Sequence, residues 1–84
     1  MKRVKRNPHE IIMEILEIAR DGARKTTIMY KVNLSFRQLQ EYLEGLNEAG
    51  FLEKNEDVWQ TTEDGLVVIK ACELCHKLMR VTTE

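Results

Sequence analysis

The sequence predicts one mostly helical domain with a small β-hairpin. Three observations support this: apolar residues recur at helical spacing in several segments, capping residues precede those segments, and two short β-prone runs flank a turn. With 84 residues, the chain is long enough for one hydrophobic core and short of the usual length of two packed domains. We therefore expect a single domain over residues 1–84, with residues 1–7 as a basic N-terminal arm.

The first helix is expected to begin at Asn7 and Pro8. Asn caps backbone N–H groups at a helix start, and Pro at the first helical position loses no hydrogen bond. Asp21 and Gly22 provide the stop. Between these limits, apolar residues recur at helical spacing: Ile11, Ile12, Ile15, Leu16, Ile18 and Ala19.

A second, brief helix is expected after residues 23–25, which are suited to a short edge strand. Thr26 or Thr27 can cap this helix, because a hydroxyl accepts hydrogen bonds from backbone N–H groups at a helix start. Asn33 tolerates the left-handed conformation that ends a helix. The apolar residues of this helix are Ile28, Met29 and Val32.

The third helix is expected from Ser35 to Gly50, and it is amphipathic. Ser35 and Gln38 have the spacing of a capping box. On a helical wheel one face is apolar and should lie in the core: Phe36, Leu39, Tyr42, Leu43 and Leu46. The opposite face carries Arg37, Gln40, Glu41, Glu44 and Glu48.

After Gly50, residues 51–54 and 58–61 are expected to form two strands of a hairpin. Residues 55–57, Asn-Glu-Asp, have a composition typical of turns. Trp59 should anchor the hairpin to the core.

The last helix is expected over residues 63–80, capped by Thr61 or Thr62. Its apolar residues cover roughly 160° of the helical wheel, against the ~100° that a helix needs to pack on its own domain. We therefore expect a homodimer through this C-terminal helix, since a two-fold interface uses the same patch twice. The interface candidates are Val67, Val68, Ala71, Cys75, Leu78 and Met79.

Charge is distributed unevenly along the chain. Residues 1–40 carry nine Lys or Arg against four acids, a net +5, whereas residues 41–84 carry four against ten, a net −6. A basic end facing an anion and an acidic end facing away would explain this asymmetry.

The order helix, strand, helix, helix, hairpin is that of a winged helix-turn-helix, with the hairpin as the wing. In this motif the N-terminal part of the third helix enters the major groove of double-stranded DNA. Arg can read guanine, Gln can read adenine and Glu can accept from cytosine. The base-reading candidates are therefore Ser35, Arg37, Gln38, Gln40 and Glu41. The candidates for contacts to the DNA backbone are Lys2, Arg3, Lys5, Arg6, Arg24, Lys25, Lys31, Lys54 and Gln60.

Four segments carry a resemblance to a known family: 26–31 (TTIMYK), 33–36 (NLSF), 42–43 with 50–52 (YL and GFL), and 61–65 (TTEDG). They are similar to archaeal winged-helix domains related to small dimeric chromatin-associated DNA-binding proteins and to short transcriptional regulators. The resemblance covers nearly the whole chain and implies the fold, DNA binding and dimerisation through the last helix. A net charge near zero favours a regulator over an abundant chromatin protein.

The acidic residues favour a second hypothesis, a winged helix that binds another protein. Glu56 and Asp57 at the wing tip, and Glu44 and Glu48 late in the third helix, would repel phosphates. In this alternative, the acidic wing and the outer face of the third helix would be the contact surface.

Residues 72–76 (CELCH) match the attachment motif of a c-type haem and half of a zinc site. Haem attachment requires export, and the N-terminus has no signal peptide. Zinc prefers four ligands, and the only other histidine is His9. Both cysteines are interpreted as small buried hydrophobes, and we expect no metal and no cofactor.

No glycine-rich phosphate loop and no nucleophile with a base is found, so the sequence favours a protein that is not an enzyme. No segment has the roughly 20 apolar residues of a membrane span. We expect a cytosolic protein with reduced thiols and no membrane partner.

Overall fold

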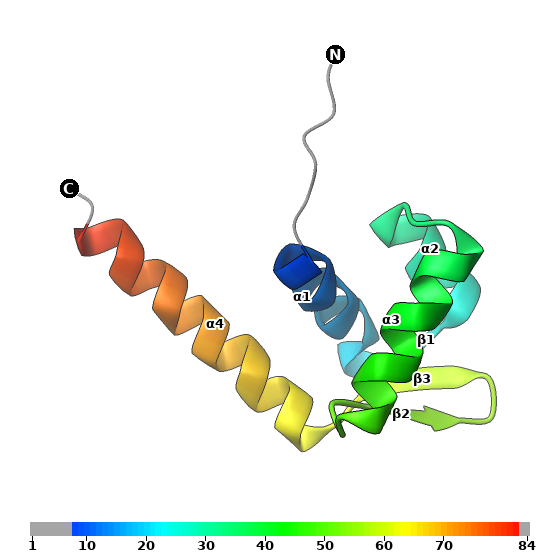
Figure 1. The fold of residues 1–84 in the computed structure, drawn as a ribbon. Coiled ribbons are helices and arrows are strands. Elements are labelled where there is room, and N and C mark those ends of the chain that lie inside the picture. Colours follow the sequence, from blue (N-terminus) through cyan, green and yellow to red (C-terminus); the bar gives the residue numbers. More distant parts are fainter. Residues whose placement is uncertain (1–7, 83–84) are drawn as a thin grey trace, which may run out of the picture.

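The computed structural model describes the backbone of residues 8–82 and the side chains of residues 8–72. The basic arm predicted for residues 1–7 lies outside the described residues. The elements are α1 (Pro8–Ile18), the 3-10 helix η1 (Ala19–Asp21), β1 (Ala23–Arg24), α2 (Lys25–Val32), α3 (Phe36–Glu48), β2 (Leu52–Asn55), β3 (Val58–Thr61) and α4 (Glu63–Thr82). This order confirms the predicted helical fold with its wing (Figure 1).

The three strands form one antiparallel sheet in the order β1-β3-β2. Ala23 of β1 pairs with Trp59 of β3, and Asn55 of β2 pairs with Val58 of β3. Because Asn55 belongs to the ladder, the hairpin turn consists of Glu56 and Asp57 alone, one residue shorter than predicted. Glu56 takes the positive φ of 58° that such a tight turn requires.

The core lies between α1, α2, α3 and the sheet, and α4 adds one buried side chain. Trp59 is 7% exposed, which confirms that it anchors the wing to the core. The other buried apolar residues are Ile11, Ile15, Leu16, Ala19, Ile28, Val32, Leu39, Leu43, Leu46, Leu52 and Ile69.

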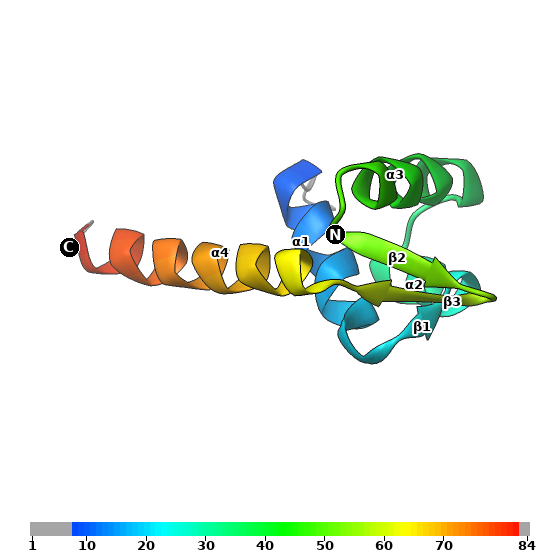
Figure 2. The same ribbon diagram turned by 90° about the horizontal axis from the view of Figure 1, so that it is seen from below.

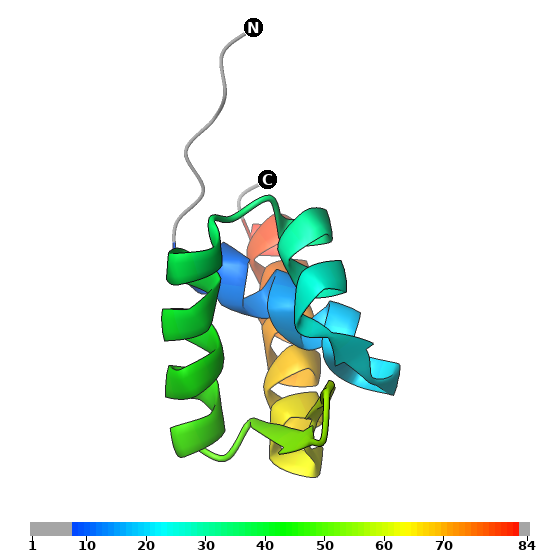
Figure 3. The ribbon, with the colours of Figure 1, turned by 90° about the vertical axis from the view of Figure 1, so that its right-hand side faces the viewer.

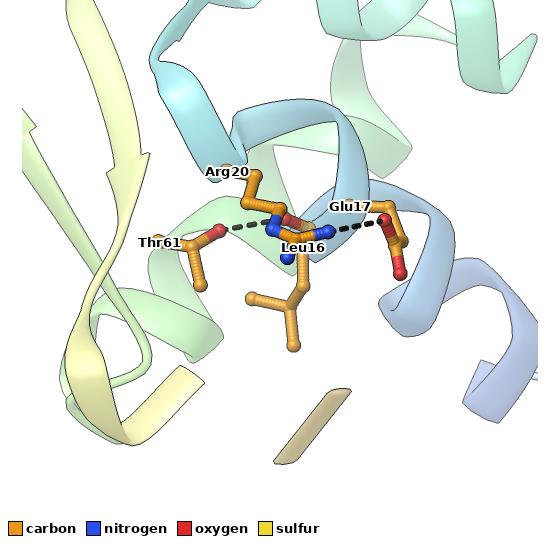
Figure 4. Close-up of polar contacts among 4 residues, drawn as sticks. All are labelled: Leu16, Glu17, Arg20 and Thr61. Atoms are coloured by element: carbon orange, nitrogen blue, oxygen red, sulfur yellow. Dashed lines mark hydrogen bonds and ion pairs between the residues drawn. The ribbon is translucent and has the colours of Figure 1, made fainter. Parts of the chain in front are cut away.

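Thr61 is the buried polar residue among the described part of the chain, and it joins β3 to α1. Its Oγ1 donates a hydrogen bond of 2.7 Å to the carbonyl oxygen of Leu16 (Figure 4). The same view shows the exposed ion pair between Arg20 and Glu17, 3.7 Å apart. Thr61 therefore satisfies a carbonyl at the end of α1 that a valine would leave without this partner.

α2 begins without the predicted side-chain cap. Arg24 is its N-cap residue, in extended conformation, and no side-chain hydrogen bond caps the helix. The prediction of Thr26 or Thr27 was wrong because β1 pairs with β3 only as far as Arg24. The chain enters the helix at the next residue, Lys25.

α4 begins at the cap that the sequence predicts. Thr62 Oγ1 accepts a hydrogen bond of 3.1 Å from the Gly65 N–H and donates one of 2.7 Å to the Gly50 carbonyl oxygen. The helix then extends beyond the rest of the domain, away from the wing and α3 (Figure 2). None of the helices in the described part of the chain combines the length and apolarity that a membrane span requires.

Candidate nucleic-acid interface

The corner between α2 and α3 is fixed by backbone and side-chain hydrogen bonds. Asn33 adopts the left-handed conformation (φ 62°, ψ 49°), as predicted, and its N–H donates to the Met29 carbonyl oxygen at 2.9 Å. Ser35 Oγ accepts from the Gln38 N–H at 3.1 Å, while Gln38 Oε1 accepts from the Ser35 N–H at 3.3 Å. This confirms the predicted capping box. Figure 3 shows the corner as the short loop that joins α2 to α3.

The first turn of α3 is exposed. Arg37 lies on the outer face, as predicted, whereas Phe36 was expected in the core and is 62% exposed. Phe36 is the first residue of the helix, and the buried stripe beneath α3 begins one turn later at Leu39. The Lys25 ammonium lies 3.6 Å from the centroid of the Phe36 ring, so a cation–π contact covers one face of that ring.

Two predicted contact residues are held in a chain of side chains within the domain. Lys25 Nζ donates a hydrogen bond to Gln40 Oε1, and Gln40 Nε2 donates one of 2.7 Å to Glu44 Oε2. Lys25 and Gln40 are therefore already partnered, and the chain links the start of α2 to the middle of α3. Among the described residues, no hydrogen bond or ion pair holds Arg37 or Glu41, and both are exposed.

The outer surface of α2 adds polar and aromatic groups beside this turn. Tyr30 is 86% exposed, and Thr26, Thr27, Tyr30 and Lys31 line a shallow, open pocket. Lys31 and Arg24, both predicted to contact phosphates, are exposed at the two ends of α2. The sequence gave no signal for Tyr30 and Phe36 as surface groups, because aromatic residues at helical spacing normally indicate core.

The wing offers less than the sequence suggested. Lys54 is exposed, with its Nζ 5.5 Å from the Trp59 ring centroid. Gln60 is half-buried and donates a weak hydrogen bond of 3.5 Å to the Arg20 carbonyl oxygen. Lys54 is therefore the better placed of the two. The four basic candidates of the arm, Lys2, Arg3, Lys5 and Arg6, lie outside the described residues.

The predicted dimer residues fall on two sides of α4. Val67 is 64% exposed and Ala71 is exposed, whereas Val68 is half-buried and packs against the core. Val68 therefore belongs to the domain's own packing. The side chains of Cys75, Leu78 and Met79 lie outside the described residues.

Comparison with known proteins finds archaeal relatives. An uncharacterized protein of Methanocaldococcus jannaschii is 42% identical over 65 residues, which cover 76% of this chain and 67% of that protein. A second uncharacterized protein of the same organism is 31% identical over 77 residues, covering 90% of this chain and 36% of that protein. The chain thus spans about two thirds of the first relative and about one third of the second.

A solved structure shares the fold. The crystal structure of Sso10a-2, a DNA-binding protein from Sulfolobus solfataricus, superposes with a TM-score of 0.75 at 23% sequence identity and covers 93% of this chain and 86% of that one. The resemblance to archaeal winged-helix domains is thereby confirmed. A family model described as winged helix-turn-helix matches residues 5–80. The chain belongs to the winged helix-turn-helix family.

Proposed function

We propose that this protein binds double-stranded DNA through the first turn of α3 and acts as a dimeric transcriptional regulator, by binding rather than by catalysis. The observation that carries the proposal is the exposure of Phe36 and Arg37 at the start of a helix held in place by a capping box. The Sulfolobus protein of the same fold is described as DNA-binding, which supports the same ligand here.

The side chains of this turn suit the major groove. An exposed Arg can pair with guanine through two hydrogen bonds, an exposed Glu can accept from a cytosine amine, and a Phe can contact the thymine methyl group. Arg37, Glu41 and Phe36 supply these three groups on one turn of helix. Glu44 and Glu48 lie nearer the C-terminus of α3, so the helix must approach DNA with its N-terminal turn first.

Binding should depend steeply on salt, because the cations around this turn would displace counterions from phosphates. Arg24, Lys31 and Lys54 are exposed in each protomer, so a dimer offers about six such contacts besides those of the arm. We expect affinity for a random-sequence duplex to fall about 10³-fold between roughly 50 and 200 mM salt. Fluorescence anisotropy of a labelled duplex measures this dependence.

The matched control is Lys70→Ala, which removes an exposed cation from α4 and should leave the affinity unchanged. Absence of binding even at low salt would contradict the DNA proposal. The alternative, a protein partner for the acidic wing and α3, would then take its place.

The dimer proposal depends on an apolar stripe of α4. Val67 and Ala71 are exposed, and Leu74 and Leu78 continue the sequence pattern with spacings of four, three and four residues, as in helices that pack along a partner helix. An exposed stripe of this kind is a liability unless a second copy covers it.

Val67→Asp should therefore convert a dimer into a monomer, because the interface would bury an unpaired carboxylate next to its symmetry mate. Sedimentation equilibrium measures the molecular mass of both forms. Lys70→Asp, an exposed position on the same helix outside this stripe, should remain dimeric. A wild-type protein that is monomeric at high micromolar concentration would contradict the proposal.

A further inference from the structure

Two chemically reactive side chains from opposite ends of the chain meet beside α4. The Nε2 atom of His9, in the first turn of α1, lies 3.1 Å from the Sγ atom of Cys72 on α4. The two residues are 63 positions apart in sequence. His9 is exposed and Cys72 is half-buried, so the pair can be reached from solvent.

The helical repeat of α4 places two further donors near this pair. Gly65 and Ile69 are buried and Cys72 contacts α1, and these positions are spaced by four and three residues. A further step of four along the same side reaches His76, and Cys75 stands one turn beyond Cys72. The backbone is helical through both positions, since α4 extends to Thr82.

We propose that His9, Cys72, Cys75 and His76 form a zinc site that joins α1 to α4. Zinc in structural sites takes four nitrogen or sulfur ligands in tetrahedral arrangement, and two cysteines with two histidines are one of its usual sets. The sequence alone disfavoured zinc because residues 72–76 provide only three donors. The contact with Cys72 identifies His9 as the fourth.

Within the described side chains, no three His, Cys, Asp or Glu residues gather closely enough to hold a metal ion. His9 and Cys72 therefore form half of the site, and the positions of Cys75 and His76 on the helix complete it. Binding requires the neutral imidazoles and the thiolates, so two protons leave the thiols when the metal enters.

The site would act on the part of α4 that leaves the domain (Figure 1). On the helical wheel, the positions of Val67, Ala71, Leu74 and Leu78 lie on the side of α4 opposite Cys72 and His76. The metal would thus set the direction of α4 from one side and leave the proposed dimer stripe accessible on the other. Cys75, a predicted interface residue, becomes a ligand instead.

Titration of Co²⁺ into the reduced, metal-free full-length protein tests the site without DNA. We expect one Co²⁺ per chain, with the visible bands of tetrahedral cobalt and a thiolate-to-metal charge-transfer band, and displacement by Zn²⁺. His9→Ala should weaken binding at least about tenfold, since loss of even an outer-shell partner costs 10–100-fold. Cys72→Ser should reduce the charge-transfer band. The control Ala71→Ser, exposed on another side of the same helix, should bind as the wild type does.

A second readout covers the case in which a variant is poorly folded. Zn²⁺ should raise the thermal midpoint of the wild type, because a ligand of the native state stabilises it, and should not raise that of His9→Ala. Circular dichroism checks that the variants keep their helical content. Absence of tetrahedral cobalt bands would overturn the proposal and leave the His9–Cys72 contact as a hydrogen bond. Unchanged affinity in His9→Ala would also overturn it, since the site would not include α1.

Discussion

Gly65→Ala is expected to destabilise the domain by about 2–3 kcal/mol, the range of overpacked positions. A Cβ atom at Gly65 would lie 2.5 Å from the Phe51 carbonyl oxygen and 2.5 Å from Thr61 Cγ2. The Phe51 oxygen cannot move away cheaply, because it accepts the Thr62 N–H hydrogen bond that leads the chain into α4. Equilibrium denaturation in urea, at one fixed protein concentration, measures the free energy of unfolding.

Gly45→Ala is the matched control, since it makes the same chemical change in the interior of α3. Nothing lies within 4 Å of a Cβ at Gly45, and the residue is exposed. Alanine favours a helix over glycine by about 0.5–1 kcal/mol, so this variant should be more stable than the wild type. Equal effects of the two substitutions would mean that α4 does not pass close to the Phe51 backbone.

The helix limits could be predicted from the sequence wherever a local signal sets them. Gly22 ends the first helical segment with φ 93°, Asn33 ends α2, and Ser35 with Gln38 starts α3. These caps are chosen by residues within one turn, so neighbours in sequence are sufficient. The start of α2 could not be predicted in this way, because it depends on how far β1 pairs with β3.

The candidate site was predictable only in part. The helical wheel correctly placed Arg37 and Glu41 on the outer face of α3, since that pattern follows from the helical repeat. The chain from Lys25 through Gln40 to Glu44 depends on the distance between α2 and α3, and the contact of His9 with Cys72 on that between α1 and α4. Neither distance can be read from the spacing of residues along one helix.

The second large effect is expected for Arg37→Ala, which should weaken DNA binding about ten- to a hundredfold. A well-made bidentate contact of Arg with guanine contributes about 1–3 kcal/mol of discrimination. Arg37 is the exposed cation of the α3 first turn, and no acid among the described residues neutralises it. Fluorescence anisotropy with duplexes selected from a random pool measures the loss. Arg20→Ala is the control: it also removes one exposed arginine, which lies in η1 and pairs with Glu17.

Arg37→Lys separates the two ways in which Arg37 could act. Lysine keeps the positive charge but not the planar pair of donors that matches a guanine edge. If Arg37 reads a base, Arg37→Lys should lose nearly as much affinity for the selected sequence as Arg37→Ala, while its binding to random duplex stays close to that of the wild type. If Arg37 only contacts phosphate, lysine should restore binding to both duplexes, and the alanine variant should show a shallower salt dependence. Restoration by lysine would therefore remove Arg37 as a base reader and leave Glu41 and Phe36 as the groups that distinguish one sequence from another.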